Sequence, residues 1–341
     1  MIDAILHEIT LRKDYLSEPI STIYFGGGTP SLLTEFELNS ILAAINNNFE
    51  VLDTVELSLE ANPDDITKEQ LSIWKKRGIN RLSIGLQSFK ESDLRWMNRA
   101  HTVEEANQCI SLAQNAGFQN LTVDLIYGLP DLSLEEWKSH IQQLIYFNVP
   151  HISAYCLTVE KNTVLANWVN KGKIKPLSED VQSEQFLALL ELLEVNGYEQ
   201  YEISNFCKKD AESKHNSNYW KGKHYIGIGP SAHSFNGTSR SWNIANNTRY
   251  IQSINKGVSF FETEILTVQN QFNELLLTGL RTKYGVRLDN LNKIIPLSKQ
   301  FKYLVDSFQK KNWLVKKENT LFLTKEGKLM ADFIASELFV D

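Results

Sequence analysis

Three cysteines are all that this chain of 341 residues contains, and they stand far apart at Cys109, Cys156 and Cys207. Such spacing provides neither a disulfide framework nor a CxxC pair for a structural metal. Few and isolated cysteines are typical of a protein in a reducing compartment, so we expect a cytoplasmic location.

Long apolar runs are missing as well, since stretches such as residues 275–277 are far shorter than a bilayer-spanning helix needs. The N-terminal residues have no basic region and no cleavage site, so we expect a helix there and not a signal peptide. A net charge of −6 argues against attraction of the whole surface to nucleic acid. With 42% hydrophobic and 22% charged residues, the composition is that of an ordinary soluble globular protein.

The first two hundred residues repeat a unit of strand and helix. Apolar, β-branched runs predict strands, and each run is followed by helical periodicity. The predicted strands are residues 22–25, 55–59, 82–86, 121–126 and 152–157. The predicted helices are residues 34–49, 67–77, 103–116, 134–147 and 179–196. Good N-cap residues and helix-ending glycines support them: Thr34, Thr67, Thr102, Ser133, Gly78, Gly117 and Gly197.

The predicted strands are continuously apolar, which indicates burial on both faces and hence a parallel sheet covered by helices. A doubly wound sheet and a (β/α) barrel both fit this pattern. Polar groups at the strand ends favour the barrel, because the strand ends of a barrel face one mouth. These groups are residues 26–29, Glu60 with Asn62, Gln87 with Ser88, Asp124 and Thr158.

The glycine-rich stretch Thr22-Ile-Tyr-Phe-Gly-Gly-Gly-Thr-Pro30 is the feature around which the chain is organised. Glycines at the end of a strand let backbone N–H groups approach a ligand closely. Such a loop can bind a polar or anionic group, although the same pattern also forms tight turns that bind no ligand.

Beyond residue 196 the pattern changes to segments rich in Gly, Asn, Ser and aromatic residues. Residues 198–206 predict a strand that leads into a polar loop. His215 and His233 follow, and each could ligate a metal, move a proton or be satisfied by local hydrogen bonds.

The C-terminal part has a different character. Helical patterns over 269–281, 288–295 and 298–311 precede a predicted hairpin with Glu318-Asn319 at its turn, and a last helix begins at Lys325. Helices followed by a hairpin indicate a winged-helix-like domain. From Arg281 to Lys328 there are 12 Lys and Arg against 4 Asp and Glu, so this part could bind nucleic acid, although a solvated charged face is the commoner cause.

These motifs together resemble the radical S-adenosylmethionine (SAM) proteins of the oxygen-independent coproporphyrinogen III oxidase group. Within that group the chain is most similar to the HemW branch of heme chaperones. The resemblance covers nearly the whole chain in order. It rests on FGGGTP (25–30), EANP (60–63), RLSIGLQSF (81–89), NRAH (98–101), DLIYGLP (124–130), YEISNF (201–206) and HNxxYW (215–220).

The resemblance implies an α/β fold with a radical SAM barrel over residues 1–200, a connecting segment with the HNxxYW motif over 201–265, and the winged-helix-like domain over 266–341. It implies that the glycine loop holds the methionyl end of SAM and that His215 binds heme iron. The residues that match the family's contacts to SAM are Gly27, Gly28, Thr29, Glu60, Gln87, Arg99, Asp124 and Thr158.

One family motif has no match in this sequence. Members carry CxxxCxxC after the first barrel strand, and these thiolates hold a 4Fe–4S cluster. The resemblance places that segment ahead of Met1, so we expect a partial (β/α)6-type barrel without its first strand. An internal start, a truncated gene and a cluster-free paralogue all remain open. These 341 residues cannot ligate the cluster, so we expect weak SAM binding and no radical chemistry, and whether the protein is an enzyme stays open.

Three functions follow from these observations. The HNxxYW motif favours a heme chaperone that passes heme to an acceptor protein, which the sequence does not identify. The alternative is an oxygen-independent coproporphyrinogen III oxidase, a radical enzyme that decarboxylates its substrate. The third reading is nucleic-acid binding through the basic C-terminal part, against which the net charge argues.

Overall fold

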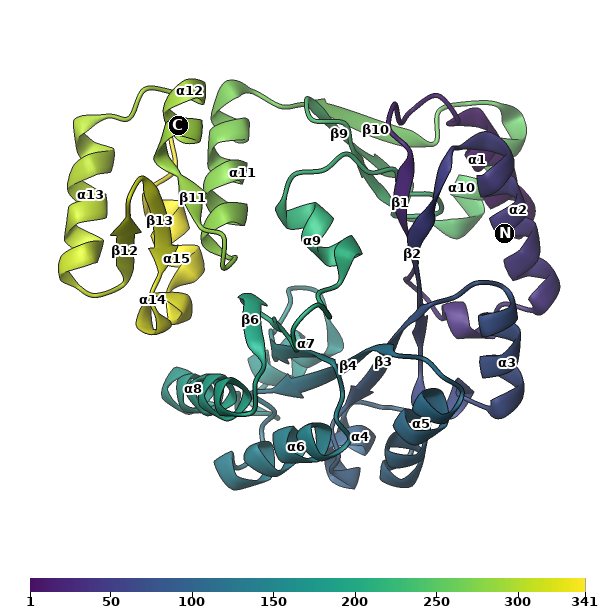
Figure 1. Cartoon of the computed structure of the whole chain (residues 1–341), viewed down its shortest axis with the longest axis horizontal. Helices are drawn as coiled ribbons and strands as arrows, with labels where there is room; N and C mark the ends of the chain where they lie inside the picture. The colour runs from purple at the N-terminus through teal and green to yellow at the C-terminus, as the bar shows by residue number, and fades with distance from the viewer. Residues whose placement is uncertain (341) are drawn as a thin grey trace. The chain divides into compact units, whose positions relative to one another are not determined.

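The computed structural model describes residues 1–340, and the fold is α/β (Figure 1). The chain divides into two compact units. The central unit consists of Tyr24–Leu32 and Leu57–Ser213, and the terminal unit consists of Met1–Ile23, Leu33–Glu56 and the residues from Lys214 onward. The boundary between the units falls inside two strands, β1 (Ile20–Phe25) and β2 (Val51–Ala61).

A seven-stranded sheet with the order β1-β2-β3-β4-β5-β7-β6 runs through the central unit. The strands from β2 to β5 are parallel and form a curled sheet like part of a barrel (Figure 1). Strand β7 pairs antiparallel with β5 and with β6. The sequence prediction of a covered parallel sheet is therefore confirmed. The remaining strands are β3 (Arg81–Gln87), β4 (Asn120–Tyr127), β5 (His151–Cys156), β6 (Glu199–Glu202) and β7 (Asn205–Cys207).

Each parallel strand of this unit is followed by helix, as the sequence predicts. The helices are η1 (Pro30–Leu32), η2 (Pro63–Asp65), α3 (Lys68–Lys76), α4 (Glu91–Trp96), α5 (Val103–Asn115), α6 (Leu134–Tyr146), α7 (Val164–Asn170) and α8 (Glu179–Val195). Capping boxes begin α5 and α6, where Thr102 and Ser133 each exchange hydrogen bonds with a glutamate three residues later. The predicted stops Gly78, Gly117 and Gly197 all have positive φ.

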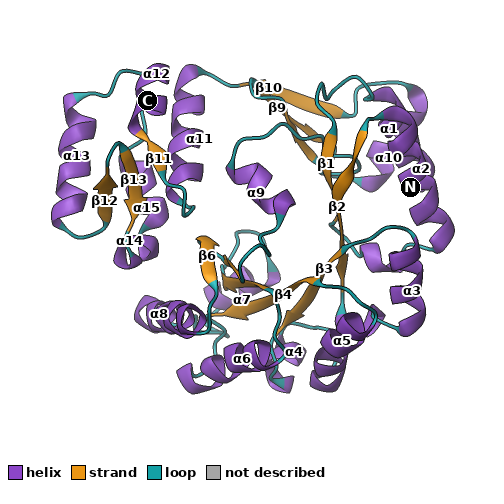
Figure 2. Ribbon diagram, in the orientation of Figure 1, coloured by secondary structure: helices purple, strands orange, loops and turns teal. Residues whose placement is uncertain are grey.

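The terminal unit contains a small antiparallel sheet with the order β10-β9-β8 (Figure 2). Two helices, α1 and α10, pack with this region around a core of Ala4, Tyr250, Ile254 and Phe260. The predicted N-terminal helix is therefore confirmed. The elements are α1 (Ile2–Leu11), α2 (Glu35–Asn48), α9 (Lys214–Trp220), β8 (His233–Phe235), β9 (Ser239–Asn243), α10 (Asn247–Lys256) and β10 (Phe261–Ile265).

The C-terminal part of this unit contains a second antiparallel sheet with the order β11-β13-β12. The predicted hairpin is present, with Glu318 at positive φ in its turn. The predicted last helix is split at Met330 into two helices. The winged-helix-like assignment and the predicted domain boundaries stay predictions. The elements are α11 (Val268–Leu280), β11 (Val286–Arg287), α12 (Leu288–Ile294), α13 (Lys299–Lys310), β12 (Leu314–Lys317), β13 (Thr320–Leu323), α14 (Lys325–Leu329) and α15 (Ala331–Glu337).

One local prediction is wrong. The stretch 198–206 does not form one strand that leads into a loop, because the chain turns at 203–204 and β6 and β7 pair as a hairpin. The Ser204 carbonyl accepts a hydrogen bond from Ala154 of β5, which holds the turn against the sheet. Within residues 1–340 no helix has the length and apolar character to span a membrane.

Candidate functional site

The glycine loop follows β1 in the central unit and is open to solvent. Gly27 and Gly28 have φ values of 78° and 65°, in the left-handed region that side chains with a Cβ disfavour. Gly26 is required for a different reason. A Cβ at this position would lie 2.5 Å from Cε1 of Tyr24 and 2.9 Å from Oε1 of Glu60. The loop therefore passes directly over these two side chains.

Glu60, at the end of β2, holds the glycine loop in place. Its Oε1 accepts a hydrogen bond of 2.8 Å from the Tyr24 hydroxyl, and its Oε2 accepts one of 3.0 Å from the Gly27 N–H. Burial, together with the neighbouring Glu60 carboxylate, raises the pKa of Tyr24, so this hydroxyl stays protonated and remains a donor. The sequence assigns Glu60 a ligand contact, and the structure adds a positioning contact to the loop.

Arg99 lies after α4, and its side chain reaches the carboxyl ends of β2 and β3. Its Nη2 donates to Oδ1 of Asn62 and to the Gly85 carbonyl, both at 2.8 Å. A Cβ on Gly85 would lie 3.3 Å from this Nη2, so the glycine allows the close approach. The Nε of Arg99 is buried and has no hydrogen-bond partner within residues 1–340. A buried donor without a partner is costly, which marks this guanidinium as incomplete without a ligand.

Gln87 ends β3 in a conformation that is rare for its residue type. Its φ is 73°, and the register between β3 and β4 shifts between Ile84 and Gln87. Irregular strand ends of this kind re-aim a side chain and are common near functional sites. A Cβ on Gly85 would also lie 3.1 Å from Nε2 of Gln87, so the same glycine makes room for both polar side chains.

Asp124 lies in β4 opposite Ser153 of β5. Burial raises the pKa of Asp124 to about 7, the hydrogen bond from Ser153 and the Arg99 charge lower it, and the Glu60 charge raises it further. Because the charges of Glu60 and Arg99 both act on the Asp124 carboxyl, these three predicted residues lie in one region of the central unit.

The hydrogen bonds of Thr158 and Thr29 are local, to residues two or three positions away in the chain. Both residues are exposed. The Thr158 hydroxyl donates to the Cys156 carbonyl at 3.4 Å, and the Thr29 carbonyl accepts from the Leu32 N–H. Their predicted roles toward SAM stay predictions. Sequence reasoning gave no role to Tyr24, Gly85 or Ser153, because a strand residue reveals its neighbours on adjacent strands only once the register is known.

His215 belongs to the terminal unit and lies at the start of α9. Its Nδ1 forms a hydrogen bond of 2.9 Å with the Thr22 hydroxyl, and its backbone N–H donates to Oε1 of Glu56 at 2.8 Å. The ring of Tyr219 packs edge-on against the imidazole, with centroids 5.0 Å apart. Burial lowers the pKa of His215 to about 4, so the imidazole is neutral near pH 7. His233, by contrast, is exposed on β8 beside Trp242.

The sequence profile of the Radical SAM superfamily matches residues 3–144. The chain is 33% identical over 326 residues to the heme chaperone HemW of Bacillus subtilis, which covers 92% of this chain and 84% of that protein. It is 31% identical over 339 residues to the heme chaperone HemW of Mycobacterium tuberculosis, covering 98% of this chain and 85% of that protein. The chain belongs to the HemW family.

A solved structure shares the fold of this HemW family member. Coproporphyrinogen III oxidase (HemN) from Escherichia coli, a radical SAM enzyme, superimposes with a TM-score of 0.84 at 21% identity, covering 99% of this chain and 82% of that chain. At this identity the likeness concerns the fold alone. It agrees with the partial α/β barrel expected from the sequence.

SAM and a 4Fe–4S cluster are features of the radical SAM superfamily, and the residues present fit the two differently. The open glycine loop and the unpartnered Arg99 Nε fit a ligand with a carboxylate. The cysteines do not fit a cluster. Cys109 is buried in α5, where burial raises its pKa to about 12, and Cys207 is buried in β7. Across residues 1–340 no group of three or more His, Cys, Asp or Glu is arranged to hold a metal ion.

Proposed function

We propose that this protein is a heme chaperone that binds heme through His215 and passes it to an acceptor protein, with SAM held at the glycine loop. The observation that carries the proposal is membership of the HemW family, whose relatives in Bacillus subtilis and Mycobacterium tuberculosis are named heme chaperones. Heme is the cargo of this function, and SAM is the bound cofactor.

His215 suits an iron ligand in three respects. Burial keeps its imidazole neutral, which is the form that ligates a metal. The hydrogen bond between Nδ1 and Thr22 fixes the ring and favours Nε2 as the ligating atom. The Tyr219 ring restricts rotation from the side. Imidazole is a usual axial ligand of heme iron.

The glycine loop and its neighbours would hold SAM in the central unit. The backbone of Gly27, Gly28 and Thr29 would receive the methionyl end, and Arg99 would donate its unpartnered Nε to the carboxylate. Glu60, Gln87 and Asp124 would supply the remaining polar contacts, and the backbone near Thr158 would lie by the adenine. When bound, SAM supplies a sulfonium nucleoside. No step that needs the 4Fe–4S cluster is assigned to these residues, because the cysteines present do not fit it.

A heme titration of the full chain, followed by the Soret band, tests the proposal. We expect saturation with one heme per chain and the spectrum of an imidazole-ligated iron. His215→Ala should remove that ligation, and Thr22→Val, which removes the partner of Nδ1, should weaken it. His224→Ala is the matched control, because His224 is an exposed histidine of the same unit.

An unchanged spectrum of His215→Ala would show that the role given to this histidine is wrong. Transfer is tested separately, by loss of the Soret signal from the loaded protein when a heme-free acceptor is added. Anaerobic turnover of coproporphyrinogen III would instead support the alternative reading as an oxidase.

A further inference from the structure

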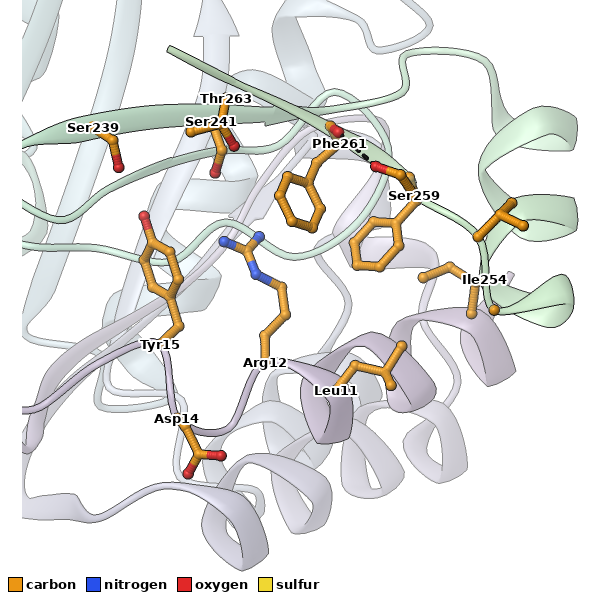
Figure 3. Close-up of a pocket in the computed structure, with 13 residues that line it drawn as sticks. Leu11, Arg12, Asp14, Tyr15, Ser239, Ser241, Ile254, Ser259, Phe261 and Thr263 are labelled. Carbon is orange, nitrogen blue, oxygen red and sulfur yellow. Dashed lines mark hydrogen bonds between the residues drawn. The ribbon is translucent and has the colours of Figure 1, made fainter. Parts of the chain in front are cut away.

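A pocket of about 500 Å³ lies within the terminal unit, between the end of α1 and the strands β9 and β10 (Figure 3). Its lining residues all belong to the terminal unit, and neither the glycine loop nor His215 is among them. Its volume falls in the range of small-molecule sites. The apolar part of its lining consists of Leu11, Ile254, Val258, Phe260 and Phe261.

Hydroxyl groups line the wall that the sheet contributes. Side chains two residues apart on a strand share a face, so Ser239 and Ser241 of β9 both face the pocket, and Thr263 of β10 pairs with Ser241. Ser241 is only 4% exposed, and its Oγ has no hydrogen-bond partner among the described residues. A buried hydroxyl normally has a hydrogen-bond partner, so this one can donate to an acceptor atom of a ligand.

Tyr15 presents a second unpartnered hydroxyl from the opposite wall. Its oxygen is buried and makes no hydrogen bond within residues 1–340. Figure 3 shows this hydroxyl pointing toward Ser239 and Ser241, whereas the Asp14 carboxylate points away. The unpartnered hydroxyls of Tyr15 and Ser241 therefore come from separate segments of the chain and line the same pocket.

The Arg12 guanidinium stands between these hydroxyls and the apolar lining (Figure 3). It is 7% exposed and lies against the rings of Tyr15 and Phe261, at 4.5 and 5.3 Å from their centroids. Its hydrogen bonds to Glu8 and to the Gly227 carbonyl both use Nη1. The Nη2 and Nε edge is thus left for a ligand, and a guanidinium edge matches the two oxygens of a carboxylate.

We propose that this pocket binds a ligand that presents one carboxylate next to an apolar body. The carboxylate lies against Arg12 and accepts from Tyr15 and Ser241, and the apolar body packs on Phe260, Phe261 and Ile254. The two hydroxyls that lack partners in the ligand-free pocket gain them in the complex. A fatty acid and the propionate edge of a porphyrin share this chemistry.

Calorimetric titration of the full chain with octanoate tests the proposal, with octanamide as the neutral probe of equal length. We expect saturable binding of one octanoate per chain, about tenfold or more tighter than octanamide, because the charge-assisted contacts to Arg12 are lost with the amide. Tyr15→Phe and Ser241→Ala should each weaken octanoate by about fivefold, the usual worth of one hydrogen bond. His215→Ala should bind octanoate like the wild type.

These two variants also separate binding from folding. Neither hydroxyl makes a hydrogen bond in the free protein, so the thermal midpoint of the ligand-free variants should not fall. Tyr303→Phe, which removes an exposed hydroxyl of the same unit, is the control. Competition with iron-free protoporphyrin IX shows which carboxylate the pocket takes. Displacement of octanoate by the porphyrin points to a propionate, and simultaneous binding of both points to a free acid. Equal binding of octanoate and octanamide, or equal binding by wild type and both variants, would overturn the proposal.

Discussion

Each unit has a glutamate whose carboxylate accepts a hydrogen bond from a glycine N–H and so holds a loop in place. The two glutamates differ in how deeply they are buried. In the central unit Glu60 accepts from Gly27 and Tyr24 and remains partly accessible. In the terminal unit Glu8 is fully buried and accepts from the Gly229 N–H, Asn243 and Tyr250, while Arg12 balances its charge. Full burial makes an anchor structural, whereas partial exposure leaves room for a ligand.

Removing the deeper anchor should have the largest effect. Glu8→Ala leaves the Arg12 charge and three donors unsatisfied in a buried region, so we expect a loss of about 3–5 kcal/mol in the free energy of unfolding. Urea unfolding of the full chain measures it. Glu18→Ala, at an exposed position before β1, is the control and should change little. A Glu8 variant as stable as that control would contradict the structural role of the anchor.

Disturbing the contact between the glycine loop and Glu60 should lower stability less than Glu8→Ala does, and should weaken SAM binding. In Gly26→Ala the added methyl group meets the Tyr24 ring and Glu60, so the loop must shift, at a cost of about 1–3 kcal/mol. We expect the saturation-transfer NMR signal of SAM to disappear in this variant. Gly172→Ala is the matched control, because Gly172 also lies in the central unit but has open space around its Cβ position and a positive φ.

The control separates backbone strain from the clash. Gly172→Ala carries only the strain of a positive φ, so it should lose about 1 kcal/mol and keep the SAM signal. If Gly26→Ala behaved like Gly172→Ala in both measurements, the contact between the loop and Glu60 would have no importance.

A third expected effect concerns the pH dependence of stability. Because folding raises the pKa of Asp124 from its ordinary value of 3.8 to about 7, the folded protein binds the extra proton between these values. Wild-type stability should therefore fall as pH rises from about 4 to about 7, by about 2 kcal/mol given that the group is only partly buried. Asp124→Asn should remove this slope, and the exposed Asp131→Asn should keep it. Urea midpoints across this range decide, and parallel profiles for wild type and Asp124→Asn would rule out the raised pKa.

The outcome for single elements shows where sequence patterns suffice. The predicted helix 134–147 is observed as Leu134–Tyr146, because its capping box and apolar periodicity are local properties. The hairpin at Glu318-Asn319 follows from turn chemistry in the same way. The hairpin of β6 and β7 was missed, since the turn at 203–204 is held by Ala154, fifty residues earlier in the chain.

The succession of strands and helices, the positions of the caps and the family's motifs are all readable from the sequence, because they depend on neighbours within a few residues. Which polar groups share a site depends on how distant segments pack together. Tyr24 meets Glu60, Arg99 meets Asn62 and Gly85, and Tyr15 and Ser241 face one pocket through strand register and helix packing. Buried polar groups find their hydrogen-bond partners on segments distant in the chain, so the groups that keep no partner are known only once those segments are packed.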